Sequence, residues 1–282
     1  MKVSKVVHLG EPGSFSHEAC LEFAPELEPI GRPTFKSVIA FLDEFSDAVA
    51  MIPIDNSHVG RVPDVYRLLP EANVSIKAEF FLRVRHMLLS VPGSSPDQVQ
   101  RVLSHPMALS QCSAALSQLG ADQVAVDSSS YAAKKVGEQN SPTIAAIGSL
   151  GAARLYGLQP ILEDIQDSHS NFTRFILLGR GPHNTRKSAA PHLSTILFEV
   201  KSIPSVLFKV LGGFATNGIN VTKLESYFND GNFEVAKFYC DFEGCMSDEN
   251  VKRALEEVRF YSKDVRLLGT YPSSDFRDRL VK

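Results

Sequence analysis

The sequence has no tryptophan and few cysteines, which narrows the chemistry it can carry. Its four cysteines are Cys20, Cys112, Cys240 and Cys245. They show no Cys-x-x-Cys spacing and no accompanying pair of histidines, so neither a zinc site nor a disulfide framework is expected. We therefore predict reduced, mostly buried thiols and no bound metal.

An excess of positive charge is also missing. The chain has 29 Lys and Arg against 32 Asp and Glu, for a net charge of -3 and a pI near 6.2. Domains that bind nucleic acid concentrate basic residues, so no nucleic-acid partner is expected. No apolar run is long enough to cross a bilayer, and residues 1–8 (MKVSKVVH) lack the apolar core of a signal peptide. These features predict a cytoplasmic protein without a membrane partner.

What the sequence does contain is a regular alternation of strand-like and helix-like segments. Its 282 residues suffice for two domains, and its 44% apolar and 22% charged content is typical of a globular protein. Strands are predicted at residues 3–9, 48–52, 74–91, 121–126 and 143–147, with helices at 17–23, 37–45, 104–119 and 128–136. This alternation predicts an α/β fold with parallel sheets, whose ligand sites lie beyond the carboxyl ends of the strands.

The pattern changes after a polar, turn-rich stretch at residues 180–188 (RGPHNTRKS), which is a candidate linker. Beyond it, strands are predicted at 193–200, 219–227, 233–242 and 265–271, and helices at 206–214 and 251–258. The segment 229–231 (NDG) is a strong hairpin signal between the second and third of these strands. The order β-α-β-β-α-β predicts a small ferredoxin-like domain.

Thr173 and Arg174 stand side by side where an apolar segment, residues 175–178 (FILL), begins. In an extended strand, neighbouring side chains point to opposite faces. The pair offers a neutral hydroxyl donor and a permanent fork-shaped cation, a combination suited to a carboxylate substrate that must lose an oxygen. The alternative is an ordinary strand end with a solvated arginine, since short motifs also occur by chance.

Four segments, in this order, resemble the motifs of prephenate dehydratase: residues 10–16 (GEPGSFS), 53–57 (PIDNS), 104–112 (SHPMALSQC) and 171–175 (NFTRF). Residues 212–227 (GGFATNGINVTKLESY) resemble the regulatory half of the bacterial two-domain form, an ACT domain. The resemblance covers nearly the whole chain. It implies a two-lobed catalytic domain like a periplasmic binding protein, with mainly parallel sheets, and a C-terminal ferredoxin-like ACT domain.

The resemblance also implies domain boundaries. The catalytic domain is expected at residues 1–182, with its second subdomain at about 76–160. A linker at 183–192 and the ACT domain at 193–275 would follow.

The reaction implied is the conversion of prephenate to phenylpyruvate, with loss of carbon dioxide and water, in phenylalanine biosynthesis. It needs no cofactor, because the ring becomes aromatic and the protein need only position and polarise the substrate. Thr173 would donate to the departing hydroxyl, and Arg174 would hold a substrate carboxylate. The other matching positions, expected to bind substrate, are Ser14, Ser16, Asp55, Asn56, Ser57, Ser104, Gln111, Ser129 and Asn171.

Serines stand at the starts of two predicted helices. Those behind Ser14 and Ser16, and behind residues 128–130, would present backbone amides to the substrate dianion. Simple N-capping is the alternative and needs no ligand, although both roles can coexist because amides beyond the cap remain free.

The chain departs from the family pattern at Asp55, where the family has Glu, at Met107, where Gln is common, and at Tyr131, whose bulk is expected to narrow the cleft. Two alternatives therefore stay open. One is an arogenate dehydratase, because Asp55 or Glu11 would favour a substrate with an amino group. The other is a non-catalytic sensor of an aromatic acid or amino acid.

In the second domain, the resemblance implies a site for L-phenylalanine as effector. Its expected residues are Ser205, Val206, Leu207, Asn217, Glu225 and Ser226. Helix core for Val206 and Leu207, and a solvated hairpin edge for Glu225 and Ser226, are the alternatives. Small domains of this kind pair across subunits, so a homodimer or homotetramer is expected.

Overall fold

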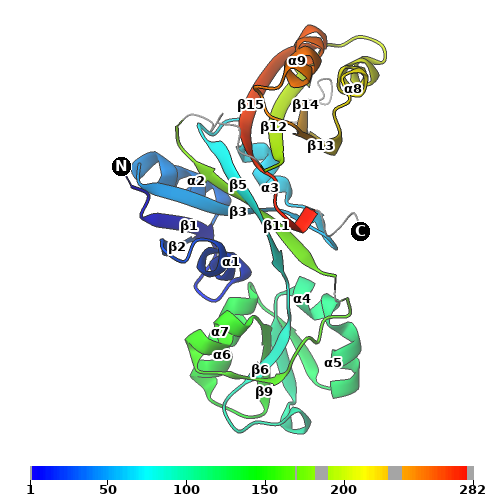
Figure 1. The fold of residues 1–282 in the computed structure, drawn as a ribbon. Helices are drawn as coiled ribbons and strands as arrows, with labels where there is room; N and C mark the ends of the chain where they lie inside the picture. Colours follow the sequence, from blue (N-terminus) through cyan, green and yellow to red (C-terminus); the bar gives the residue numbers. More distant parts are fainter. Residues whose placement is uncertain (1, 169, 182–189, 228–236, 278–282) are drawn as a thin grey trace.

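The protein, seen as a computed structural model, consists of three sheets arranged in a row (Figure 1). The structure describes residues 2–168, 170–181, 190–227 and 237–277. The first sheet lies in the middle, the second forms the lower lobe, and the third lies at the opposite end. This arrangement confirms the predicted α/β class with two lobes and a ferredoxin-like domain.

The first sheet has the strand order β2-β1-β3-β11-β5, with β4 on the edge of β3. Val6 and Val7 of β1 point to opposite faces, and both are fully buried because α1 covers one face and α2 the other. The elements of this unit are β1 Lys5–Leu9, α1 Phe15–Phe23, β2 Glu28–Arg32, α2 Phe35–Glu44, β3 Ala48–Asn56, β4 Gly60–Arg61, α3 Pro63–Leu68, β5 Ser75–Arg83 and β11 Phe172–Gly179.

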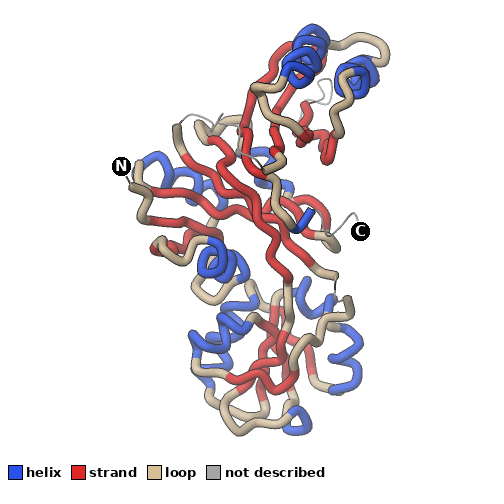
Figure 2. The backbone as a smooth tube through the Cα atoms, viewed as in Figure 1, coloured by secondary structure: helices blue, strands red, loops and turns tan. Residues whose placement is uncertain are grey.

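The second sheet has the order β10-β6-β9-β7-β8 and forms the lower lobe. Its elements are β6 Met87–Ser90, the short helix η1 Pro96–Gln98, β7 Arg101–Ser104, α4 Pro106–Gln111, α5 Ser113–Leu119, β8 Asp122–Ala125, α6 Ser129–Gln139, β9 Ile144–Gly148, α7 Leu150–Tyr156 and β10 Gln159–Leu162. The chain enters this lobe after β5 and returns before β11, so two long strands of the first sheet carry both crossings (Figure 2).

Parallel pairing is limited to part of each lobe. Strands β2, β1 and β3 are parallel, as are β9, β7 and β8, whereas β11 runs antiparallel to both β3 and β5. The sheets are therefore mixed rather than mainly parallel. The reason is the crossing itself, because a strand that leaves for the second lobe and one that returns run in opposite directions. Moreover β5, expected within the second subdomain at about 76–160, is hydrogen-bonded into the first sheet.

The third sheet, β13-β14-β12-β15, has the predicted βαββαβ order. One face carries α8 and α9, while Leu193 and Leu197 on the other face pack into the core of the first unit beside Ile76. A Cβ on Gly269 of β15 would lie 2.4 Å from the Ile76 carbonyl oxygen, so glycine permits this close approach. The elements are β12 His192–Val200, α8 Val206–Thr216, β13 Val221–Tyr227, β14 Lys237–Glu243, α9 Glu249–Tyr261 and β15 Ser262–Pro272.

Two features expected from the sequence cannot be compared with the structure. The hairpin turn at 229–231 lies outside the described residues, as does most of the linker at 183–192. Helices α3 and α7 and strands β2 and β10 were not predicted; each is short and has few apolar residues in a regular pattern.

A buried ionic cluster around Arg174 ties the first sheet to the third. Its Nε donates to Glu79 of β5 at 2.8 Å, its Nη1 to Asp241 of β14 at 2.6 Å, and its Nη2 to the Tyr271 hydroxyl of β15 at 3.1 Å. The carboxylates of Glu79 and Asp241 are fully buried. Burial acts to raise the pKa of Glu79, but hydrogen bonds from Arg277 and the charge of Arg174 outweigh it and lower that pKa.

This cluster leads to a stability prediction. We expect Arg174→Met to lower the free energy of unfolding by about 3 to 5 kcal/mol, because two buried carboxylates lose their shared cation. The measurement is urea unfolding of the whole chain at neutral pH. The control is Arg67→Met, whose side chain is 70% exposed and pairs with Asp64 within one helix, so a change below about 0.5 kcal/mol is expected. Equal effects of the two substitutions would contradict the role of the cluster.

A second prediction concerns acid stability. His8 of β1 is fully buried. Burial lowers its pKa to about 4, with a smaller contribution from His17. The fold therefore holds His8 neutral, and its contribution is complete above pH 6.5, the unfolded value, and is lost as the pH falls towards 4. The free energy of unfolding falls by about 3 kcal/mol in total, because one proton binds to His8 more weakly in the folded protein than in the unfolded chain.

We therefore expect His8→Met to flatten the decrease of unfolding free energy between pH 6.5 and pH 4, measured by urea unfolding at several pH values. A variant whose pH dependence parallels that of the parent protein would show that His8 does not titrate on unfolding.

Candidate active site

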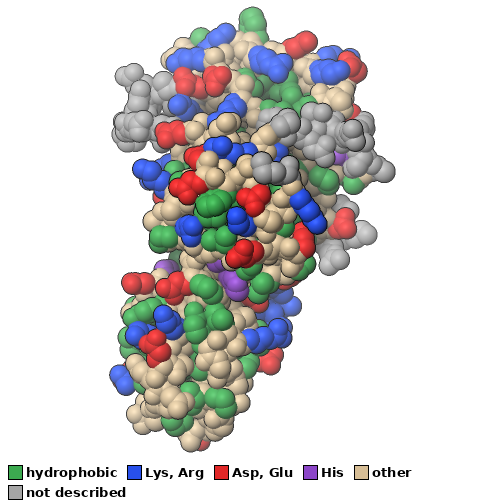
Figure 3. All heavy atoms as spheres, turned by 90° about the vertical axis from the view of Figure 1, so that its left-hand side faces the viewer, with side chains coloured by type: hydrophobic (Ala, Val, Ile, Leu, Met, Phe, Trp, Pro, Cys, Tyr) green, Lys and Arg blue, Asp and Glu red, His purple; other side chains and the backbone are tan. Residues whose placement is uncertain are grey.

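A cavity of about 350 Å³ lies between the two lobes. It is lined by the loops that follow β1, β3, β7, β8 and β9 and by the residues at the two crossings. In the space-filling view, histidine side chains gather at the narrowing between the lower lobe and the rest of the molecule (Figure 3). The volume suits a small molecule.

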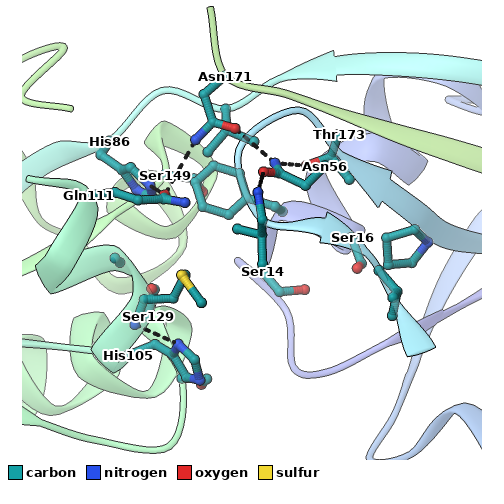
Figure 4. Close-up of a pocket in the computed structure, with 18 of the residues that line it drawn as sticks. Ser14, Ser16, Asn56, His86, His105, Gln111, Ser129, Ser149, Asn171 and Thr173 are labelled. Carbon is teal, nitrogen blue, oxygen red and sulfur yellow. Dashed lines mark hydrogen bonds between the residues drawn. The ribbon is translucent and has the colours of Figure 1, made fainter. Parts of the chain in front are cut away.

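The cavity brings together seven of the residues expected to bind or convert substrate. They are Ser14, Ser16, Asn56, Gln111, Ser129, Asn171 and Thr173. Figure 4 shows them converging from both lobes on one space.

The Thr173 hydroxyl is held as a donor toward this space. The Asn56 side-chain oxygen accepts the backbone N–H groups of His58 and Val59, at 2.9 and 3.0 Å. Its amide nitrogen must therefore donate, and it does so to Thr173 Oγ1 at 3.0 Å (Figure 4). Because Oγ1 accepts this bond, its own hydrogen is left for a ligand in the cavity.

The same amide nitrogen anchors a chain of hydrogen bonds across the cavity. Asn56 donates to Asn171 at 2.8 Å, Asn171 to Gln111 at 3.3 Å, and Gln111 also accepts from His86 Nε2 at 2.9 Å. Burial lowers the pKa of His86, which favours the neutral ring, and an amide oxygen can only accept, so the contact with Gln111 Oε1 assigns the donor to Nε2. The chain joins both lobes and fixes every amide orientation along it.

Four helices start at the cavity. The caps of α1, α6 and α7 are the hydroxyls of Ser14, Ser128 and Ser149, which accept backbone N–H groups at 3.2, 3.0 and 3.1 Å. His105 caps α4 in the same way at 3.2 Å. Helix N-termini carry partial positive charge and free amides, so the cavity favours an anion. The capping and ligand roles of the serines are compatible in this geometry.

The β1–α1 loop closes the cavity against the lower lobe. Ser149 Oγ donates to the Gly13 carbonyl at 3.1 Å, and Ser130 Oγ donates to the Pro12 carbonyl. Gly13 has a φ of +85°, and a Cβ there would lie 3.1 Å from Ala152 Cα. Glycine is therefore required for this contact.

Charged side chains are scarce around the cavity. Among the lining residues in the described part of the chain, Arg61 is charged, and no aspartate or glutamate takes part. The described residues also contain no group of three or more His, Cys, Asp or Glu side chains placed to hold a metal ion.

Four expected site residues lie elsewhere. Arg174 faces the third sheet, as strand alternation requires once Thr173 faces the cavity, so its assignment as substrate anchor needs correction. Asp55 shares that side, where it bonds Lys223 at 2.9 Å and Tyr66 at 3.1 Å. Ser57 bonds the backbone at Ser170 and Phe172 outside the cavity. Ser104 is fully buried behind Ser129, 3.0 Å from its hydroxyl.

The three departures from the family pattern lie in different parts of the structure. Met107 lines the cavity and is 42% exposed. Tyr131, expected to narrow the cleft, is not among the lining residues; Lys135 lies over its ring, 5.5 Å from the centroid. Only one departure therefore changes the cavity wall.

Sequence reasoning missed His86, Ser149 and Arg61. Ser149 carried a signal, since it follows a predicted strand and precedes an apolar segment, as a cap does. His86 and Arg61 carried none, because neither belongs to a recognisable motif.

The six residues expected to bind an effector lie on α8 and β13. Ser205, with a φ of +57°, precedes α8, which starts with Val206 and Leu207, and Asn217 ends it. Glu225 and Ser226 are on β13. Their assignment stays a prediction.

Comparison with known proteins identifies the family. Residues 6–183 match the family model of prephenate dehydratase. The chain belongs to the prephenate dehydratase family.

The described helices are all too short or too polar to span a membrane.

Two curated relatives of this family illustrate its range. A bifunctional N-acyl-homoserine lactone acylase/prephenate dehydratase of Komagataeibacter europaeus is 38% identical over 268 residues, covering 95% of each chain. The chloroplastic arogenate dehydratase/prephenate dehydratase 1 of Arabidopsis thaliana is 35% identical over 277 residues, covering 93% of this chain and 70% of that one.

Two solved structures share the fold over nearly the full length. One is GqqA, described as a novel type of quorum quenching acylase, with a TM-score of 0.90, 37% identity and coverage of 96% and 99%. The other is the prephenate dehydratase of Arthrobacter aurescens in complex with L-Phe, with a TM-score of 0.86, 26% identity and coverage of 96% and 90%. The family and the homologues support a dehydratase.

Proposed function

We propose that the protein is a prephenate dehydratase that makes phenylpyruvate in phenylalanine biosynthesis. The observation that carries this proposal is the Thr173 hydroxyl, which accepts from Asn56 and so keeps its own hydrogen for a ligand. It faces a cavity at which four helices start, a setting suited to a dianion whose hydroxyl must leave.

The proposed reaction follows from this geometry. The bond between the ring and its carboxylate breaks, carbon dioxide leaves, and the electron pair enters the ring as the hydroxyl departs from the opposite carbon. Thr173 donates a hydrogen bond to the departing oxygen, which leaves as water after taking up one proton from solvent. A threonine is a weak acid, so it contributes an oriented hydrogen-bond donor rather than a proton.

The absence of a carboxylate favours prephenate over arogenate. Asp55 is engaged by Lys223 and Tyr66 away from the cavity, and Glu11 lines a separate surface pocket with Pro12 and Tyr156. None of the lining residues in the described ranges is acidic, so an ammonium group would lose water without gaining a charged partner. A keto group carries no such penalty.

The sensor hypothesis has less support than the enzyme. It depended on changes at Asp55, Met107 and Tyr131, of which only Met107 lines the cavity. The Thr173–Asn56–Asn171 network, which a sensor would not need, is intact.

Acylase activity, named for two relatives, also has less support. It requires a nucleophile activated by a base. In this cavity Thr173 bonds to an amide, His86 bonds to Gln111, and His105 caps a helix. None of these described contacts joins a hydroxyl to a histidine.

Regulation by L-phenylalanine is also proposed. Because a prephenate dehydratase of the same fold was solved with L-Phe, we infer that L-phenylalanine is an effector here, bound by the residues of α8 and β13 named above. We also propose that the protein is a cytoplasmic homodimer or homotetramer that needs no cofactor.

The proposal is tested by turnover of the purified full chain with prephenate and with arogenate. Phenylpyruvate absorbs strongly in alkali and phenylalanine does not, so the products are distinguished. We expect kcat/KM for prephenate to exceed that for arogenate at least tenfold, because the ammonium group finds no charged partner. The reverse order would assign an arogenate dehydratase, and folded protein inactive on both would favour the sensor.

Thr173→Val tests the donor. The variant keeps the shape of the side chain and leaves Asn56 bonded to Asn171, so we expect kcat to fall about a hundredfold or more while KM changes less than about threefold. Thr222→Val, in the neighbouring cavity beside the third sheet, is the control and should leave both constants unchanged. A retained kcat in Thr173→Val would remove Thr173 from the mechanism.

A further inference from the structure

His86 lies where the chain first crosses from one lobe to the other, between β5 and β6, and it is buried. The returning crossing holds its main chain on both sides. The N–H of His86 donates to Gln166 Oε1 at 2.8 Å, and its carbonyl accepts from the N–H of Ile165 at 3.0 Å. The ring of Phe15 lies nearly perpendicular to the imidazole, at 83° and 5.4 Å between centroids. His86 is therefore held in place beside the cavity that it lines.

The two nitrogens of the His86 ring have different surroundings. Nε2 lies 2.9 Å from Gln111 Oε1, whereas Nδ1 is buried and has no hydrogen-bond partner among the described residues. A proton on Nδ1 would bury an N–H without an acceptor, and it would also turn the Nε2 lone pair toward an oxygen that can only accept. The surroundings of His86 therefore select the tautomer with the proton on Nε2.

The side-chain amide of Gln111 receives two hydrogen bonds on its oxygen. Oε1 accepts from His86 Nε2 and also, at 3.3 Å, from Asn171 Nδ2. The amide nitrogen has no partner among the described residues and is not fully buried. Figure 4 shows the side chain reaching toward the space between the lobes. Its two N–H groups are therefore donors available to a ligand.

The two ends of this hydrogen-bond chain are anchored differently. At one end, two backbone N–H groups fix the Asn56 oxygen, so Asn56 orients Thr173 without help from the lower lobe. At the other end, no backbone group of the described residues bonds the Gln111 amide, and the shorter of its two bonds comes from His86. Removing the His86 donor would leave Thr173 oriented and would loosen the Gln111 amide.

We propose that His86 is a positioning residue, whose Nε2–H holds Gln111 so that the Gln111 amide nitrogen donates to the bound substrate. This proposal rests on the proposed function. The carboxylate and keto oxygens of prephenate can only accept, so an inverted amide would face them with an oxygen lone pair. His86 thus acts on substrate capture through Gln111, whereas Thr173 acts on the departing hydroxyl.

His86→Leu and His86→Gln form a matched pair of variants. Leucine removes the donor together with the unpartnered Nδ1, and glutamine keeps an N–H donor at a similar reach. Loss of one hydrogen bond predicts that KM for prephenate rises about fivefold to tenfold in His86→Leu, with kcat changed less than about twofold. His86→Gln should restore KM to within about twofold of the parent value. An unchanged KM in folded His86→Leu, a fall in kcat alone, or equal KM values in the two variants would overturn the proposal.

A double-mutant cycle tests whether His86 acts through Gln111. Gln111→Met removes the amide and keeps the length of the side chain. His86→Leu should raise KM in the parent protein but leave it unchanged in the Gln111→Met background, because its action passes through the missing amide. The same KM ratio in both backgrounds would show that His86 acts independently of Gln111 and would overturn the positioning role.

A measurement on the parent protein needs no turnover and no folded variant. In ¹⁵N NMR of the histidine rings at neutral pH, we expect the His86 signals to show a proton on Nε2 and a lone pair on Nδ1. The opposite tautomer would overturn the proposal whatever the enzymatic activity is.

Calorimetric binding of prephenate distinguishes failure of this proposal from failure of the proposed function. If the parent protein binds prephenate without converting it, the function fails, and the Kd values of His86→Leu and His86→Gln still decide the role of His86. A parent protein that neither binds nor converts prephenate overturns both.

Discussion

The buried guanidinium of Arg174 is the constraint on which the rest of the structure depends. It lies on β11, yet its partners come from β5 of the first sheet and from β14 and β15 of the third. Breaking such a cluster leaves buried carboxylates without compensation, so its members are held in one geometry. The two sheets and the strand that carries Thr173 therefore form one unit.

The position of Thr173 follows from that constraint. Side chains alternate along β11, so fixing Arg174 toward the third sheet directs Thr173 toward the cavity between the lobes. Asn56, opposite Thr173 on β3, then orients the hydroxyl, and Gly60 and Arg61 pair back onto the same strand end. One face of this short region carries the proposed chemistry, while the other carries the attachment of the third sheet.

Much of this arrangement could be predicted from sequence because it is local. Alternation placed Thr173 and Arg174 on opposite faces, and serine caps at helix starts marked Ser14 and residues 128–130. The function of Arg174 could not be predicted in the same way. Its partner Asp241 is 67 residues away in the chain, and only the packing of the third sheet shows that this face is covered.

The same reason explains the other differences. Asp55 faces the third sheet rather than the cavity because it occupies the opposite face of β3 from Asn56. Arg61 belongs to no motif, and its side chain bonds β13 of the third sheet. Motifs identified the family and most of the cavity wall, whereas long-range packing decided which charges reach it.

The most direct test of the account is a crystal structure with phenylpyruvate bound. The account predicts the ligand between the lobes, with Thr173 Oγ1 facing it and Arg174 still bonded to Glu79 and Asp241. A ligand carboxylate on Arg174, in the cavity beside the third sheet, would contradict it.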